Sequence, residues 1–190
     1  MIGRTVWGID LAPMYASTGT IGAEAEGATV VDVPCGGGVA LRGVKPGQSI
    51  NLVVIDIDQK MLARTTARAD VRGIYGITTI EADMRELPLD DASVDLLCTF
   101  SGLHMIDAPH RAVVEFGRVV KPGGRLIGSS FTGDGSRRQR RLFAAGERRG
   151  LAKAPADGAT IASWLNAAGF QDVDTRGRGF AVFEARRSPV

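Results

Sequence analysis

The chain has 190 residues, of which 44% are hydrophobic and 23% are charged, and its formal net charge is +2. A chain of this length and composition is expected to fold as one soluble globular domain around a single core. The small net charge gives no reason to expect a nucleic-acid partner. No run approaches the roughly 18 consecutive apolar residues of a membrane span.

The N-terminus and the cysteines indicate the compartment. The chain does not begin with a basic segment followed by a long apolar core, so no secretion signal is expected. Cys35 and Cys98 lie at the predicted ends of buried strands and are not expected to form a disulfide. We therefore expect a cytoplasmic protein.

Residues 1–28 contain apolar side chains, Trp7 and Met14 among them, that are compatible with an amphipathic segment. Pro13 and the glycines at positions 19, 22 and 27 exclude one long helix.

Residues 29–38 (TVVDVPCGGG) combine a short buried strand with a glycine-rich turn. The apolar β-branched run carries one acid, Asp32, and then breaks into three glycines. Glycine lets the chain turn sharply and lets backbone N–H groups approach a ligand closely. A helix is expected to follow, which would put the turn at the carboxyl edge of a sheet, where open α/β sheets bind nucleotides.

Two later apolar runs also end in acids. Residues 51–58 (NLVVIDID) form a second strand, and Asp56 lies 18 positions after Gly38. An acid at the end of the second strand is in the position that hydrogen-bonds ribose hydroxyls. The third run, near 78–82, is followed by Asp83. Together the three strand ends predict a site for a nucleoside.

The rest of the chain predicts alternating helices and strands. Asp58 is expected to cap a helix through about Ala69, and Asp107 to cap a helix that begins at Pro109. The other predicted elements are a short helix over 39–44, strands over 94–100 and 125–130, helices over 136–149 and 160–168, and a final antiparallel pair over 173–175 and 179–185.

The predicted helix over 136–149 is locally basic. Its arginines are Arg137, Arg138, Arg140, Arg141, Arg148 and Arg149. They fit either a solvated face or an anion-binding patch for a carboxylate, a phosphate or an acidic carrier.

Six segments, in this order, resemble the class I S-adenosylmethionine (SAM)-dependent methyltransferases, in the small-molecule branch that includes the ubiquinone/menaquinone-biosynthesis type. The segments are 31–38 (VDVPCGGG), 55–62 (IDIDQKML), 81–88 (EADMRELP), 93–97 (SVDLL), 101–104 (SGLH) and 118–126 (RVVKPGGRL). One departure is Pro34, where many members have the first glycine of the loop.

The resemblance implies an α/β fold: a Rossmann-like, doubly wound, mostly parallel seven-stranded sheet with an antiparallel C-terminal strand and helices on both faces. It also implies one methyltransferase domain over 1–190. Residues 1–28 would form an N-terminal lid, 29–132 the SAM-binding core, and 133–190 the substrate-side helices and final strands.

The resemblance further implies a cofactor site and assigns parts of it. Asp32 would lie beneath the loop and face the positive methionine end of SAM, Asp56 would take the ribose hydroxyls, and Asp83 the adenine amino group. The residues implied to contact SAM are Asp32, Pro34, Cys35, Gly36, Gly38, Asp56, Ile57, Asp83, Met84 and Ser101.

Methyl transfer from a sulfonium needs the acceptor to be held in line with the methyl group, so positioning and removal of water can supply most of the catalysis. If the acceptor must lose a proton, His104 is the best candidate base. The expected acceptor pocket consists of Trp7, Tyr15, Leu103, His104 and Phe131, which suits a small molecule that is partly apolar or anionic. Two histidines and two separated cysteines predict no metal site.

Two other functions remain open. A nicotinamide-dependent oxidoreductase is disfavoured because Leu41 occupies the position of the third fingerprint glycine. A Tyr-x-x-x-Lys pair is also absent, since Gly19 follows Tyr15 and Thr79 follows Tyr75 at that spacing. A non-catalytic SAM-binding module is the other alternative.

Overall fold

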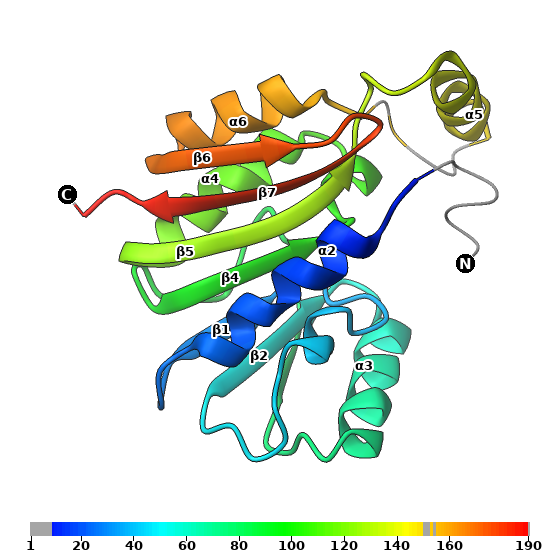
Figure 1. Cartoon of the computed structure of the whole chain (residues 1–190). Coiled ribbons are helices and arrows are strands. Elements are labelled where there is room, and N and C mark those ends of the chain that lie inside the picture. The colour runs from blue at the N-terminus through cyan, green and yellow to red at the C-terminus, as the bar shows by residue number, and fades with distance from the viewer. Residues whose placement is uncertain (1–8, 150–152, 154, 190) are drawn as a thin grey trace.

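The computed structural model describes residues 9–149, 153 and 155–189 of the chain. Seven strands form one sheet in the order β3-β2-β1-β4-β5-β7-β6 (Figure 1). The strands are β1 (Thr29–Asp32), β2 (Asn51–Asp56), β3 (Thr78–Glu81), β4 (Val94–Phe100), β5 (Val120–Phe131), β6 (Phe170–Arg176) and β7 (Phe180–Arg187). Strand β7 runs antiparallel to both β5 and β6, whereas the other neighbouring pairs are parallel. The predicted mostly parallel sheet with an antiparallel C-terminal strand is confirmed.

Helices cover both faces of the sheet (Figure 1). The helices of the described ranges are α2 (Ala12–Ser17), α3 (Gln59–Val71), α4 (Pro109–Val119), α5 (Arg137–Glu147) and α6 (Gly158–Ala167), with 3-10 turns η1 (Thr18–Ala23), η2 (Ala40–Arg42) and η3 (Leu103–Met105). In those ranges, no helix combines the length and the apolar character needed to cross a bilayer.

Alternate residues of each central strand pack on opposite faces. On β1, Val31 belongs to the apolar layer beneath α4 and α6, and Val30 to the layer beneath α2, η1 and α3. On β4, Leu97 and Leu96 divide in the same way. Because both faces are buried, the central strands are continuous apolar runs rather than alternating ones.

The first described helix packs on the sheet. Pro13 stands in the first turn of α2, where its missing N–H costs no helical hydrogen bond. Met14 and Ile21 are buried with Val30 and Ile127 in the layer on this face. Met14 is therefore a core residue, although the resemblance made it a lid candidate.

Several element boundaries differ from the sequence prediction. The expected helix over 39–44 is only the turn η2, because Gly43 ends it and Pro46 follows. Asp58 caps α3 as predicted, since its side chain accepts a hydrogen bond from Lys60 N at 2.8 Å. The Asp107 cap is wrong: Ala108, in the left-handed region, is the N-cap of α4, and no side chain caps that helix.

Candidate SAM-binding crevice

The carboxyl ends of β1, β2 and β4 and the segment after β3 surround a crevice of about 500 Å³. This volume lies in the range of small-molecule sites. Its lining comprises residues 33–37, 56–57, 82–85, 100–102 and 105–106, with Val39 and Met61. Eight of the ten residues expected to contact the cofactor line it; Asp32 and Gly38 do not.

The glycine loop is tied to the end of β2 by its backbone. Cys35 N donates to Ile55 O at 2.8 Å, and Gly36 N donates to Asp56 Oδ2 at 2.8 Å. Gly36 has a φ of +48° and Gly38 a φ of +73°, a region that side-chain-bearing residues rarely adopt. The glycines therefore permit the turn that brings the loop onto β2.

Helix α3 supports the loop from the other side. Thr65 Oγ1 donates to Gly36 O at 2.9 Å, and the Arg68 guanidinium donates to Gly37 O. A Cβ on Gly38 would lie 2.9 Å from Leu41 Cδ1, so this glycine is also required by packing. Gly38 is thus part of the support for the loop and not of the crevice wall.

Pro34 is accommodated by a glycine on the neighbouring segment. A Cβ on Gly102 would lie 2.3 Å from Pro34 Cδ, so the proline ring occupies the space that a side chain at 102 would need. Both residues line the crevice, and the Val33–Pro34 peptide bond is cis. The loop is held through the N–H groups of Val33, Cys35 and Gly36, and none of these bonds needs an N–H at position 34.

Asp56 is buried, and its two carboxylate oxygens each accept one backbone hydrogen bond. Oδ2 accepts from Gly36 N, and Oδ1 accepts from Asp58 N at 3.0 Å. A carboxylate oxygen has more than one acceptor position. Asp56 can therefore hold the loop and still accept ribose hydroxyls.

Asp83 is engaged by a residue that the sequence reasoning missed. Arg85 Nε lies 3.0 Å from Asp83 Oδ1 and 3.1 Å from Oδ2, and Arg85 Nη2 lies 2.5 Å from Oδ2. These hydrogen bonds lower the pKa of the Asp83 carboxyl. Arg85 Nη1 also donates to Asp107 O at 3.2 Å, which ties the segment after β3 to the start of α4. The sequence did offer a signal for this ion pair, because Arg85 stands only two positions after Asp83.

The wall that carries Asp83 and Met84 is anchored from α4. Glu115 Oε2 accepts from Leu87 N at 2.8 Å, and Arg118 donates to Leu87 O at 2.9 Å and to Leu89 O at 2.8 Å. Arg118 and Glu115 also form an ion pair, and the hydrogen bonds from Arg118 lower the pKa of Glu115.

Asp32 is placed differently from the expectation. It is 1% exposed and does not line the crevice, although its neighbour Val33 does. Both of its oxygens are buried without a hydrogen-bond partner in the described part of the chain. Burial raises its pKa well above the usual value, and the nearby Asp56 adds to the shift. Because successive side chains of a strand point to opposite faces, Asp32 is turned away from the crevice that Val33 reaches.

His104 also lies outside the crevice lining, although its neighbour Met105 belongs to it. The imidazole packs edge-on against Phe131, with ring centroids 4.8 Å apart, and Nδ1 lies 3.4 Å from Ser130 Oγ. Burial lowers the pKa of His104 to about 4. The ring is therefore held neutral within an aromatic cluster.

The remaining residues expected in the acceptor pocket are dispersed. Leu103 is buried in the layer beneath α4, and Phe131 contacts Phe143 and Phe180 as well as His104. Tyr15 is 39% exposed and lies under the Arg42 guanidinium, 4.4 Å from the ring centroid. None of the three lines the crevice. Trp7 lies outside the described residues.

The groups that line the crevice are suited to binding SAM. The glycine loop approaches the site without side chains, Asp56 supplies a carboxylate, and Ile57 and Met84 supply apolar surface for a purine. Ser101, with a φ of 59°, turns the chain at the end of β4. The arrangement can bind an adenosine with a polar tail and leave one end open toward Met105 and Ile106.

Comparison with known proteins identifies the family. The family model described as "Methyltransferase domain" matches residues 31–128. This segment begins within β1 and ends within β5, and it includes the whole crevice lining. The match supports methyl transfer and not the oxidoreductase alternative.

Curated relatives match half of the chain or more. The ubiquinone/menaquinone biosynthesis C-methyltransferase of Brucella anthropi is 34% identical over 109 residues, which cover 56% of this chain and 41% of that protein. The demethylmenaquinone methyltransferase of Clavibacter sepedonicus is 27% identical over 174 residues, covering 81% of this chain and 70% of that protein. The chain spans about a third to two-fifths of the length of several curated relatives that it matches.

Among solved structures, a putative methyltransferase from Bacillus halodurans superposes with a TM-score of 0.77 at 16% identity, covering 93% of this chain and 100% of that one. This likeness concerns the fold. With the matched family model and the cofactor crevice, it shows that the chain belongs to the methyltransferase domain family, within the class I SAM-dependent methyltransferases.

Proposed function

We propose that this protein transfers a methyl group from SAM to a small, largely apolar acceptor. The observation that carries the proposal is the apolar character of the crevice lining near Ser101. Phe100, Met105 and Ile106 belong to this part of the lining. Met105 is 53% exposed at the edge of this crevice. An apolar acceptor that covers it would remove this surface from water.

When bound, SAM supplies an electrophilic methyl group on a sulfonium. The glycine loop and Asp56 would hold the nucleoside part, while Asp83, kept ionised by Arg85, would accept from the adenine amino group. The wall at Met105 and Ile106 would orient the acceptor and exclude water. Rate enhancement would thus come mainly from alignment of the two reactants.

We assign no general base within the crevice. His104, the candidate from the sequence, is neutral and packed against Phe131, and it precedes Met105 on η3. Its proposed role is to position the Met105 wall. A reaction without a base favours acceptors that ionise readily, such as phenols and hydroquinones, or neutral amines.

The names of the relatives agree with an acceptor of this chemical class. The Brucella anthropi and Clavibacter sepedonicus proteins are named for ubiquinone, menaquinone and demethylmenaquinone. Reduced quinones are therefore the first acceptors to test.

The test is transfer of labelled methyl from SAM to a panel of hydroquinones, simple phenols and polar amines. Met105→Lys should lower transfer to apolar acceptors about 10-fold or more while SAM binding is unchanged. Val114→Lys is the matched control, because Val114 is also exposed, at 60%, but lies on α4 outside the crevice lining. SAM binding without transfer to any acceptor would favour the non-catalytic module. Transfer confined to polar amines would contradict the apolar acceptor.

A further inference from the structure

Helix α5 and the residues that follow it carry six arginines and a single acid, Glu147. The arginines, all exposed, are Arg137, Arg138, Arg140, Arg141, Arg148 and Arg149. We call this set the α5 arginine face. Neither the fold nor the crevice accounts for it.

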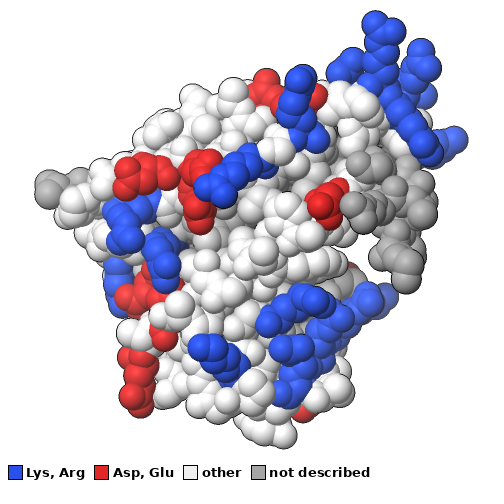
Figure 2. Space-filling model, in the orientation of Figure 1, with Lys and Arg blue, Asp and Glu red and all other residues white. Residues whose placement is uncertain are grey.

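The helix is fixed to the protein by its other side. Ser136 and Gln139 form a capping box that sets its start, and Gln139 and Phe143 are buried. The Phe143 ring packs against Phe131, with centroids 5.2 Å apart, and its centroid lies 6.4 Å from that of His104. Since α5 has 11 residues, it extends about 16 Å. The arginines therefore project from a short, supported helix and point into solvent (Figure 2).

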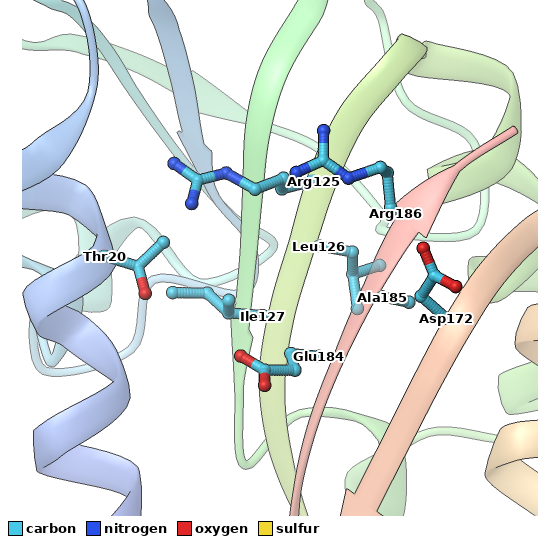
Figure 3. A pocket seen from close by; sticks show the side chains of 8 residues that line it. All are labelled: Thr20, Arg125, Leu126, Ile127, Asp172, Glu184, Ala185 and Arg186. Atoms are coloured by element: carbon cyan, nitrogen blue, oxygen red, sulfur yellow. The ribbon is translucent and has the colours of Figure 1, made fainter. Parts of the chain in front are cut away.

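Within residues 9–149, 153 and 155–189, no carboxylate forms an ion pair with the α5 arginine face. Arg140 donates to Gly135 O at 2.6 Å, which leaves its charge uncompensated. One arginine outside this set differs. Arg125, in the amino-terminal half of β5, forms an ion pair with Glu24. Arg125 also lines a second cavity, and the carboxylates of Asp172 and Glu184 line that cavity too (Figure 3).

The α5 arginine face lies at the carboxyl edge of the sheet, the edge that holds the crevice (Figure 1). The Phe143 ring of α5 lies beside the His104 ring. Met105, which follows His104 in the chain, lines the crevice. On the loop side, Arg64 and Arg68 are exposed on α3 beside Gly37. Figure 2 shows that basic side chains gather in separate groups on this face of the molecule.

Exposed apolar side chains also lie at this edge of the sheet. Ile57 and Met105, which line the crevice, are 66% and 53% exposed. The total net charge is only +2, so the positive charge at this edge is a local feature and not a general property of the surface. Guanidinium groups bind phosphates through paired hydrogen bonds.

We propose that this edge docks on an anionic lipid bilayer, with the α5 arginine face on the headgroup phosphates and the crevice opening toward the lipid. Each arginine near such a surface strengthens binding roughly fivefold. The exposed Ile57 and Met105 suit the interface of a bilayer. Single-stranded nucleic acid is usually held by aromatic rings as well as cations, and the rim residues Ile57 and Met105 are aliphatic.

The test is co-sedimentation of the full chain with vesicles, without SAM or acceptor, so that its outcome is independent of the proposed methyl transfer. Vesicles of phosphatidylcholine alone are compared with vesicles containing about one-third phosphatidylglycerol. We expect binding only to the anionic vesicles, and loss of that binding at high salt. Arg138→Gln/Arg141→Gln should weaken the partition roughly 25-fold.

Arg72→Gln/Arg186→Gln is the matched control, because both residues are exposed near the opposite edge of the sheet and the pair removes the same charge. This control should bind within about twofold of wild type. A thermal melt of each variant separates lost binding from lost folding. Failure to bind anionic vesicles, equal binding to neutral vesicles, or an equal loss in the control overturns the proposal. Tighter binding to single-stranded RNA or polyglutamate at equal anionic charge overturns it as well.

Discussion

The backbone N of Gly36 lies 2.8 Å from Asp56 Oδ2, and this hydrogen bond joins the glycine loop after β1 to the end of β2. The residue expected to bind the ribose is thereby also the residue that sets the shape of the glycine loop. Hydrogen bonds within the protein therefore hold the loop in this shape.

Asp32→Asn should make the protein more stable at neutral and alkaline pH. Burial raises the folded-state pKa of Asp32 above its unfolded value of 3.8, so the contribution of this carboxyl to stability is lost as the pH rises through the folded-state pKa. Asparagine does not titrate and removes this loss. Urea denaturation from about pH 5 to about pH 8 measures it. Asp70→Asn, at an exposed position of α3, should reproduce the wild-type pH dependence.

His104 should make the protein sensitive to acid in the opposite direction. Its folded-state pKa, about 4, is below the usual 6.5, so the unfolded chain takes up the proton first and stability falls as the pH drops from about 6.5 toward 4. Between pH 7 and pH 5 the contribution of His104 to stability should fall by about 2 kcal/mol. His104→Gln should lose less stability than wild type between pH 7 and pH 5. His110→Gln, at an exposed position, is the control and should behave as wild type does. An unchanged slope in His104→Gln would show that the imidazole is accessible.

Gly102→Ala should destabilise the protein by about 1–3 kcal/mol, since the added Cβ overlaps the Pro34 ring. The same substitution in a Pro34→Ala background should cost less, because Cγ and Cδ of the ring are gone. A double-mutant cycle by urea denaturation gives the coupling between the two positions. Additive effects would mean that the ring and Gly102 are not in contact.

Arg118→Gln should lower stability by about 1–3 kcal/mol and also weaken SAM binding. The guanidinium holds Leu87 O, Leu89 O and Glu115, so its loss frees the wall that carries Met84. Denaturation and SAM titration check the two effects. Arg111→Gln, exposed on the same helix, is the control and should change neither appreciably.

The strand-end residues could be predicted from the sequence because local patterns encode them. Apolar runs that end in glycines or an acid put Gly36, Asp56 and Met84 at one edge of a parallel sheet, and all three line the crevice. The sheet and its antiparallel strand were implied by the resemblance to the methyltransferases, and the structure confirms them.

Contacts between distant segments could not be predicted in this way. Glu115 and Arg118 support the crevice wall from α4, and no local pattern joins them to Leu87. Whether the Asp32 side chain faces the crevice depends on which face of the sheet it points to, and this face is opposite to that of Val33. The surroundings of His104 depend on how α5 packs, because Phe143 comes from that helix.

The central claim is that this crevice binds SAM through Asp56, and calorimetric titration tests it most directly. SAM and S-adenosylhomocysteine would be titrated into wild type, Asp56→Ala and the exposed control Asp70→Ala. The account predicts micromolar binding by wild type and by the control, and binding weaker by about 10-fold or more, or about 1.4 kcal/mol, in Asp56→Ala. No binding by wild type, or equal affinity in Asp56→Ala, would contradict it.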